Sequence, residues 1–365
     1  MSADADLQFL RNFQRLLSEG DFSATYKFAL LRALADLSVE RAVAYAVGLE
    51  LSVGDIAEKF IEYYWRQARP FRDAILSQSG KGQAEVVTAV VEIQGKYSHS
   101  LAEVRSKPAI WRRLVTRVAR NVERDPLRRL QTLPSGPAHF LYEQPAERGA
   151  GTPPAEVTIL LRAGAVRAFR QFYPLILSLL EAAWVRRVLS IRSNALMVSE
   201  GNDIGGFLFG SDRRPLDAYR DALLQVHKSR CFYCDSRPRG DLHVDHFIPW
   251  SRYPIDLGHN FVLACRACNE SKSDHLAGTS VLSRWKDANI DDGQALSEVL
   301  LSRGLPGDPH RALTVARWAY EQAEGAQVLV WAGRQQFERL GSGWRSLLVT
   351  MPQTALAAEE AAKYE

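Results

Sequence analysis

Four cysteines form two C-x-x-C pairs, C-F-Y-C with Cys231 and Cys234 and C-R-A-C with Cys265 and Cys268, and the sequence has no other cysteine. Two such pairs have the ligand spacing of a tetrahedral structural zinc site, which four thiolates close completely. The opening residues M-S-A-D-A-D lack the apolar stretch of a secretory signal, so we expect a cytoplasmic location where thiols stay reduced. The pattern therefore favours bound Zn²⁺ over a disulfide framework.

Between the two pairs lies a second group of polar residues, in the segment D-L-H-V-D-H-F-I-P-W at 241–250. Its histidines and aspartates could complete a zinc site, or they could form a separate centre that the cysteines hold in place. Because the four cysteines already satisfy Zn²⁺, several nearby polar residues need another explanation, namely Asp245, His246, Asn260 and Asn269.

The elements around these residues are predicted to be strand, loop, strand and helix. L-H-V-D-H-F-I, bounded by Gly240 and Pro249, indicates the first strand, and H-N-F-V-L-A-C indicates the second. C-N-E-S-K-S-D-H-L begins the helix. Alternation puts His243 and Asp245 on one face of the first strand and His246 on the other. One Zn²⁺ would then clamp both ends of a unit too small to bury much core of its own.

Residues 228–280 resemble the HNH endonucleases, also called ββα-metal nucleases. The resemblance rests on C-F-Y-C, V-D-H-F-I-P-W-S and G-H-N-F-V-L-A-C-R-A-C-N-E-S-K. The 14 positions from His246 to Asn260 and the nine from Asn260 to Asn269 are similar to the family's spacing. The resemblance implies a metal-dependent endonuclease that hydrolyses phosphodiester bonds, with DNA as the expected substrate.

The same resemblance implies a role for each of four residues. His246 would be the general base that activates water, a task suited to a side chain that titrates near neutral pH. Asp245 and Asn269 would hold Mg²⁺ or Mn²⁺, which prefer hard oxygen ligands, and the metal would polarise the scissile phosphate. Asn260 would be structural, its amide tying the loop to the strand that carries His246.

Basic residues are the candidates for holding nucleic acid. Residues 112–129 contain seven arginines against two acids, and helical spacing puts four of the arginines on one face: Arg113, Arg117, Arg120 and Arg124. Such a face is either a phosphate-binding stripe or simply solvated. Four further candidates belong to the core segment: His243, Lys272, Arg252 and Arg266. His243 is equally well explained as a packed or solvated residue.

The rest of the chain sets the domain plan. A length of 365 residues has room for two or three domains, and a net charge of +4 permits a nucleic-acid partner without requiring one. The apolar runs are too short to cross a membrane. We expect an α+β, mostly α fold with these parts: a helical N-terminal domain at 1–130 that is either winged-helix-like or a plain bundle, a Pro/Gly-rich linker at 131–155, a helical region at 156–220, the HNH core at 221–285 and a helical C-terminal region at 286–365.

Other functions remain open at this point. The core could be a non-catalytic, zinc-stabilised module for binding nucleic acid or protein. A zinc deaminase is a poorer fit, because that class needs H-x-E and an open zinc position, whereas H-V-D stands here and four cysteines close the site. The overall plan resembles bacterial stand-alone HNH proteins of restriction and anti-phage defence, including Zorya-like systems. That implies other defence proteins as partners, and a homodimer if one core per chain is to cut both strands.

Overall fold

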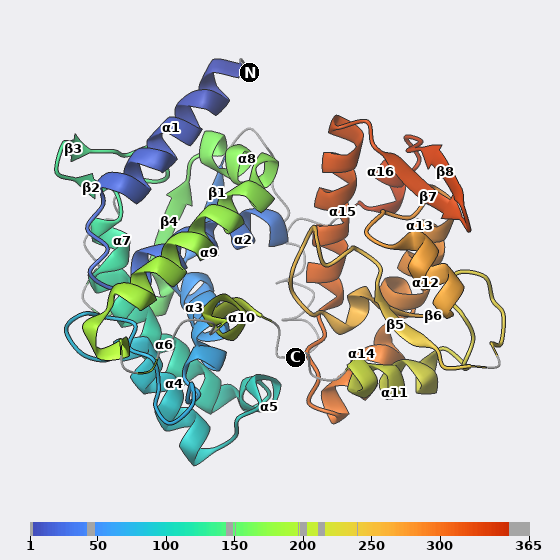
Figure 1. Ribbon diagram of the computed structural model, residues 1–365, viewed down its shortest axis with the longest axis horizontal. Coiled ribbons are helices and arrows are strands. Elements are labelled where there is room, and N and C mark those ends of the chain that lie inside the picture. The colour runs from blue at the N-terminus through green and yellow to red at the C-terminus, as the bar shows by residue number, and fades with distance from the viewer. Residues whose placement is uncertain are drawn as a thin grey trace. The chain divides into compact units, whose positions relative to one another are not determined.

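The computed structural model describes residues 3–41, 48–143, 149, 151–195, 197, 203–210, 216–238 and 240–349. The chain forms two compact units: unit 1 comprises Met1–Ser38 and Val43–Gly210, and unit 2 comprises Val39–Ala42 and Ser211–Glu365. Helices dominate both units, and the strands form two-stranded antiparallel sheets, which confirms the predicted α+β, mostly α class (Figure 1). Among the helices of the described ranges, none combines the length and apolarity needed to cross a bilayer.

Unit 1 is a helical assembly with two small strand pairs. β1 (Leu49–Ser52) pairs antiparallel with β4 (Thr158–Leu161), and β2 (Thr132–Leu133) pairs with β3 (Gly136–Pro137). Two short 3₁₀ turns accompany them, η1 (Pro154–Glu156) and η2 (Arg192–Asn194). The helices are α1 (Ala3–Glu19), α2 (Tyr26–Glu40), α3 (Val53–Gln67), α4 (Glu85–Lys96), α5 (Leu101–Arg105), α6 (Pro108–Arg124), α7 (Pro126–Arg129), α8 (Ala163–Gln171), α9 (Tyr173–Ser190) and α10 (Ile204–Phe209).

Helix α3 shows how local sequence and core packing agree in this unit. The Ser52 hydroxyl accepts a hydrogen bond from the Asp55 backbone N–H at 2.9 Å, and the Asp55 carboxylate accepts one from the Ser52 N–H at 3.0 Å. This capping box satisfies two free donors at the helix start. The buried face of α3 carries Tyr64, whose ring lies 5.5 Å from that of Trp184 on α9. Large aromatic contacts of this kind make up much of the unit's core.

The predicted linker at 131–155 does not separate two compact units in the structure. Strands β1 and β4 come from either side of it and pair with each other, so both flanks belong to unit 1. Within it, the Gln131 amide donates to the Tyr142 carbonyl and accepts from the Leu141 N–H, both at 2.8 Å. Leu141 and Tyr142 are fully buried. In the described part of this stretch, proline and glycine lie in or close to turns inside one unit, which composition alone does not distinguish from a boundary.

Within the region predicted as helical at 156–220, two separate helices, α8 and α9, follow each other directly. The chain leaves the helical conformation at Phe172, where ψ is 19°. Pro174 lies in the first turn of α9, where a missing backbone N–H needs no partner. In a continuous helix the proline ring would clash with the carbonyl four residues earlier, so α8 ends before this point.

Unit 2 contains the predicted strand, strand and helix as β5 (His243–His246), β6 (Phe261–Ala264) and α12 (Arg266–Lys272), which confirms that part of the prediction. β5 and β6 pair antiparallel, with His246 opposite Phe261. The other elements are α11 (Leu216–Val226), the 3₁₀ turn η3 (Gly258–Asn260), α13 (Thr279–Lys286), the π-helical turn η4 (Asp287–Asp291), α14 (Gln294–Ser302), α15 (Pro309–Gly325), β7 (Leu329–Gly333), β8 (Gln336–Arg339) and α16 (Trp344–Leu347).

Two helices cover the β5–β6 pair. On α11, the Tyr219 ring lies 4.6 Å from that of Phe261, whereas on α12 the Lys272 ammonium contacts Asp245 at 3.1 Å. Phe261 and Asp245 belong to opposite faces, because side chains alternate along paired strands. The two strands are therefore enclosed from both sides, and most of their side chains are buried.

The C-terminal region predicted as helical at 286–365 also contains a β-hairpin, β7–β8. Its turn passes through Arg334 and Gln335, and Gln335 adopts a positive φ of 59°. The hairpin is held by backbone bonds of 2.7 Å, from the Trp331 N–H to the Leu276 carbonyl and from the Gly278 N–H to the Trp331 carbonyl. The apolar run V-L-V-W is too short to separate strand from helix by its sequence period. Residues 350–365 lie outside the described residues.

Candidate active site and zinc centre

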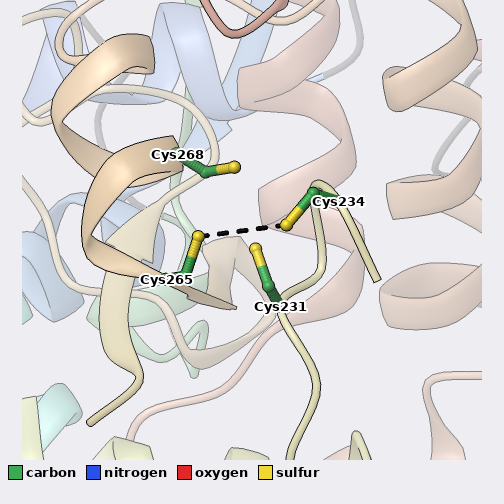
Figure 2. A group of neighbouring side chains, drawn as sticks. All are labelled: Cys231, Cys234, Cys265 and Cys268. Carbon is green, nitrogen blue, oxygen red and sulfur yellow. Dashed lines mark hydrogen bonds between the residues drawn. The ribbon is translucent and has the colours of Figure 1, made fainter. Parts of the chain in front are cut away.

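The four cysteine side chains lie close together although 30 residues separate the first pair from the second. Cys231 and Cys234 come from the turn before β5, Cys265 precedes α12 and Cys268 lies in its first turn; all four side chains point toward one another (Figure 2). Their sulfur atoms lie within 4.8 Å of one another, and the Cys234 and Cys265 sulfurs are 3.9 Å apart. A tetrahedral zinc with Zn–S bonds of about 2.3 Å requires sulfur atoms about 3.8 Å apart. The cluster therefore fits zinc.

The turn that carries the first pair is locally stabilised. The Cys231 N–H donates to the Ser236 carbonyl at 2.9 Å, and the Asp235 N–H donates to the Cys231 carbonyl at 2.8 Å. Asp235 has a φ of 55°, a conformation that aspartate tolerates better than most residues. Burial opposes ionisation of Cys234, yet hydrogen bonds from Ser236 and from neighbouring thiols lower its pKa to about 6. A thiolate is thus favoured at neutral pH, as a metal ligand must be.

Asp245 is held by two donors from different elements. The Tyr233 hydroxyl donates to Asp245 Oδ2 at 2.6 Å, and the Lys272 ammonium lies 3.1 Å from the same oxygen. Asp245 is nearly buried, so this pairing compensates its lost hydration. Both contacts use Oδ2, and the described part of the chain places no hydrogen bond on Oδ1. One carboxylate oxygen is thus fixed and the other is uncommitted.

Lys272 was predicted as a possible phosphate contact, and the structure contradicts this. Its side chain is fully buried, and its ammonium donates to the His246 carbonyl at 2.9 Å besides pairing with Asp245. Burial lowers the pKa of Lys272, which the nearby Asp245 carboxylate opposes. Lys272 therefore clamps α12 to β5 and has no surface left for a ligand. Sequence period alone did not show which face of this short helix is buried.

His246 contacts an acid that the sequence reasoning missed. Its Nε2 lies 2.9 Å from Oδ1 of Asp256, in the loop between β5 and η3, and both side chains are mostly shielded. The imidazole also contacts two aromatic rings edge to face, with its centroid 5.3 Å from that of Trp250 and 4.6 Å from that of Phe261. These contacts fix the ring plane. Asp256 lies ten residues after His246 and four before Asn260, and only that proximity in sequence could have drawn attention to it.

Asn260 ties the loop to the residues just after His246. Its side-chain oxygen accepts from the Ile248 N–H at 2.8 Å, and its amide nitrogen donates to the Ile248 carbonyl at 3.0 Å. The preceding residue is held from the far side, because the Asn289 amide and the Trp285 indole each donate to the His259 carbonyl at 3.0 Å. Asn260 is thus in the position of a structural residue. Asn289 belongs to the π-helical turn, which the sequence did not indicate.

The remaining predicted site residues differ in their surroundings. Asn269, the proposed second metal ligand, is half-buried in the first turn of α12, and its side chain makes no hydrogen bond within the described ranges. His243 is exposed. Arg266 forms an exposed ion pair with Glu270 at 2.7 Å. Arg252 is half-buried with its Nε lacking a hydrogen-bond partner, and burial lowers its pKa.

The predicted arginine face lies on α6 in unit 1. Arg117 is already paired, at 2.9 Å with Glu85 and at 2.6 Å with Glu92, both on α4. This arginine therefore joins two helices rather than facing solvent alone. Its three companions are exposed and form no ion pair with the described residues: Arg113, Arg120 and Arg124.

A comparison with known families agrees with this geometry. A family described as HNH endonuclease matches residues 231–275. That range begins at the first cysteine and includes β5, β6 and α12. Unit 2 therefore contains an HNH domain with a cysteine cluster that can bind zinc, and the class as a whole implies a nuclease acting on nucleic acid.

A second family, described as Domain of unknown function (DUF8808), matches residues 6–204. The match covers more than half of the 365-residue chain, and the chain belongs to this family. The matched range falls almost entirely within unit 1. Neither the curated proteins nor the solved structures contain a match to the chain.

Proposed function

We propose that unit 2 is a metal-dependent HNH endonuclease that hydrolyses phosphodiester bonds in DNA. The observation that carries the proposal is the contact between His246 and Asp256 at 2.9 Å, together with the preceding residue Asp245, whose second carboxylate oxygen is uncommitted. A structural zinc site alone requires neither feature. The HNH match supports the reaction class.

The proton transfer can be assigned to one imidazole nitrogen. When Nε2 of His246 carries hydrogen, it donates to the Asp256 carboxylate, and Nδ1 is then the nitrogen that accepts a proton. A water that gives its proton to Nδ1 attacks phosphorus, and the bond from phosphorus to the leaving oxygen breaks. Asp256 stabilises the imidazolium that forms and keeps the ring in one orientation, as the carboxylate does in an Asp–His pair.

The residues present also fit a hard divalent metal. Asp245 Oδ1 and the Asn269 amide oxygen have no hydrogen-bond partner within the described chain, and both are ligand types that Mg²⁺ and Mn²⁺ prefer. We assign these two residues to that metal, which when bound supplies charge stabilisation at the phosphate. Tyr233 and Lys272 keep the Asp245 carboxylate in place by holding its other oxygen.

The arginines suggest how DNA is held. Arg252, a half-buried cation in the same loop as Asp256, is our candidate for pairing with a phosphate. Arg113, Arg120 and Arg124 on unit 1 offer further positive charge. We extend the proposal to restriction or anti-phage defence, supported by the chain's plan of a large helical unit before a nuclease core. The Zorya-like relationship, a homodimer and a cytoplasmic location stay predictions.

Plasmid cleavage tests the proposal directly. Purified full-length protein is incubated with supercoiled plasmid and Mg²⁺, Mn²⁺ or EDTA, and open-circular and linear products are followed. We expect metal-dependent cleavage that His246→Ala reduces at least roughly 100-fold, the usual weight of a general base. His275→Ala is the matched control, a partly exposed histidine of the same unit, and should cut normally. If His246→Ala cuts at the wild-type rate, or intact protein never cuts, the non-catalytic zinc module becomes the better explanation.

A further inference from the structure

One cation contacts the cysteine cluster directly, and it comes from far along the chain. Arg334, at the turn of the β7–β8 hairpin, directs its Nε at the Cys268 sulfur at 3.4 Å and its Nη2 at the Cys265 sulfur at 3.3 Å. The same Nη2 lies 3.8 Å from the Cys234 sulfur. Three of the four sulfur atoms therefore face a single guanidinium. Residue 334 lies well outside the range matched by the HNH family.

The hairpin holds Arg334 in this place through several contacts with α12 and its surroundings. The Trp331 indole and the Gln335 backbone N–H both donate to the Ser271 hydroxyl, at 3.0 and 3.1 Å. The Trp331 ring also lies 5.1 Å from the ring of Tyr233, which stands between the first two cysteines. The bonds to Ser271 come from residues on both sides of Arg334 in the chain. Arg334 is thus presented by an anchored turn and does not depend on a loose side chain finding the cluster.

Electrostatics explains why an arginine belongs there. Four thiolates around one Zn²⁺ carry a net charge of −2, and a neighbouring cation lowers the free energy of that assembly. N–H groups that donate to ligand sulfurs also fix their orientation, as outer contacts do at metal sites generally. Arginine can address two sulfurs at once through its planar fork, whereas lysine offers a single charged point.

We propose that Arg334 is a positioning residue of the zinc centre, through which the C-terminal hairpin closes the centre and retains the metal. The zinc-dependent unit then extends beyond residues 231–275 to include β7 and β8. This inference is independent of catalysis, because it concerns how firmly the structural metal is held. It would stand even if the protein cut no DNA.

Zinc release from the full-length, zinc-loaded protein to a chromogenic chelator tests the proposal. We expect Arg334→Gln to release Zn²⁺ roughly 10–100-fold faster than the wild type, the usual effect of losing such an outer contact. Arg334→Lys should fall between them. Arg339→Gln is the matched control: it removes the same charge from the same hairpin, at an exposed position on β8.

Replacing Zn²⁺ with Co²⁺ gives a second measurement, an absorption spectrum that would not change if Arg334 only supported the fold. Hydrogen bonds to the thiolates alter their electron density, so the thiolate-to-Co²⁺ absorption bands should shift in the Arg334 variants and stay unchanged in Arg339→Gln. Wild-type release rates in Arg334→Gln overturn the proposal, and so does equal acceleration in Arg339→Gln. If Arg334→Gln does not fold, Arg334→Lys decides: release at the wild-type rate from that variant overturns the proposal as well.

Discussion

Asp256→Asn is the substitution that most directly probes the proposed chemistry. It preserves the shape of the side chain beside His246 and removes only its charge. The His246 Nε2 and Asp256 Oδ1 atoms are 2.9 Å apart, and the two side chains are 16% and 19% exposed. For a partly shielded pair, an effective dielectric constant of about 40 gives an attraction of about 3 kcal/mol. That attraction arises only when the imidazole becomes charged, so it lowers the barrier by this amount, or roughly 100-fold in rate.

The assay is a double-mutant cycle on single-turnover plasmid nicking. We expect Asp256→Asn to slow nicking roughly 100-fold, and to cause no further loss once His246→Ala is present, because Asp256 acts through His246. Asp241→Asn is the control, since that carboxylate precedes β5 and its side chain is 84% exposed. An equal loss in both backgrounds would refute the reasoning by showing that Asp256 acts elsewhere. So would a decrease of only two- to three-fold.

Two further predictions concern stability, both measured by urea unfolding with zinc present. Lys272→Met should lower the free energy of unfolding by roughly 3–5 kcal/mol, because it leaves the Asp245 carboxylate buried without its cation. Adding Asp245→Asn to Lys272→Met should recover most of that loss. If stability does not recover, the ion pair is not the cause of the loss. Burial lowers the pKa of His259 to about 4 in the folded protein. Below pH 6.5 the His259 imidazole therefore takes up a proton readily only in the unfolded chain. The free energy of unfolding should then fall by about 2 kcal/mol between pH 7 and pH 5. His259→Gln should lack this component, and an identical pH dependence in both proteins would contradict it.

The local chemistry of the core could be predicted from the sequence because it is encoded over short distances. Two C-x-x-C pairs have few uses in a chain with no other cysteine, and the structure brings their sulfurs together as expected. The strands β5 and β6 and the helix α12 also lie where turn residues and alternation predicted them. Each of these signals acts within about ten residues, where backbone geometry limits the possibilities.

The wider organisation could not be predicted in this way. The proline- and glycine-rich stretch at 131–155 has the composition of a linker, yet β1 and β4 pair across it. Whether a turn lies inside a unit or between two is decided by pairing with distant residues, and local composition carries no information about that pairing. The β7–β8 hairpin was missed for a related reason, since its short apolar run is stabilised by contacts with Trp331 that come from another part of the chain.

The sequence by itself determined which residue types are present for metal binding and proton transfer, and their order along the chain. Tertiary structure decided what each of them touches. It buried Lys272 against Asp245, set Asp256 against His246 and brought Arg334 to the zinc ligands. The physical reason is that charges and hydrogen bonds act through space, over a few ångströms, between elements that are far apart in sequence. The spacing of a motif indicates which residues are ligands. The residues that orient those ligands come into contact with them only when the chain folds.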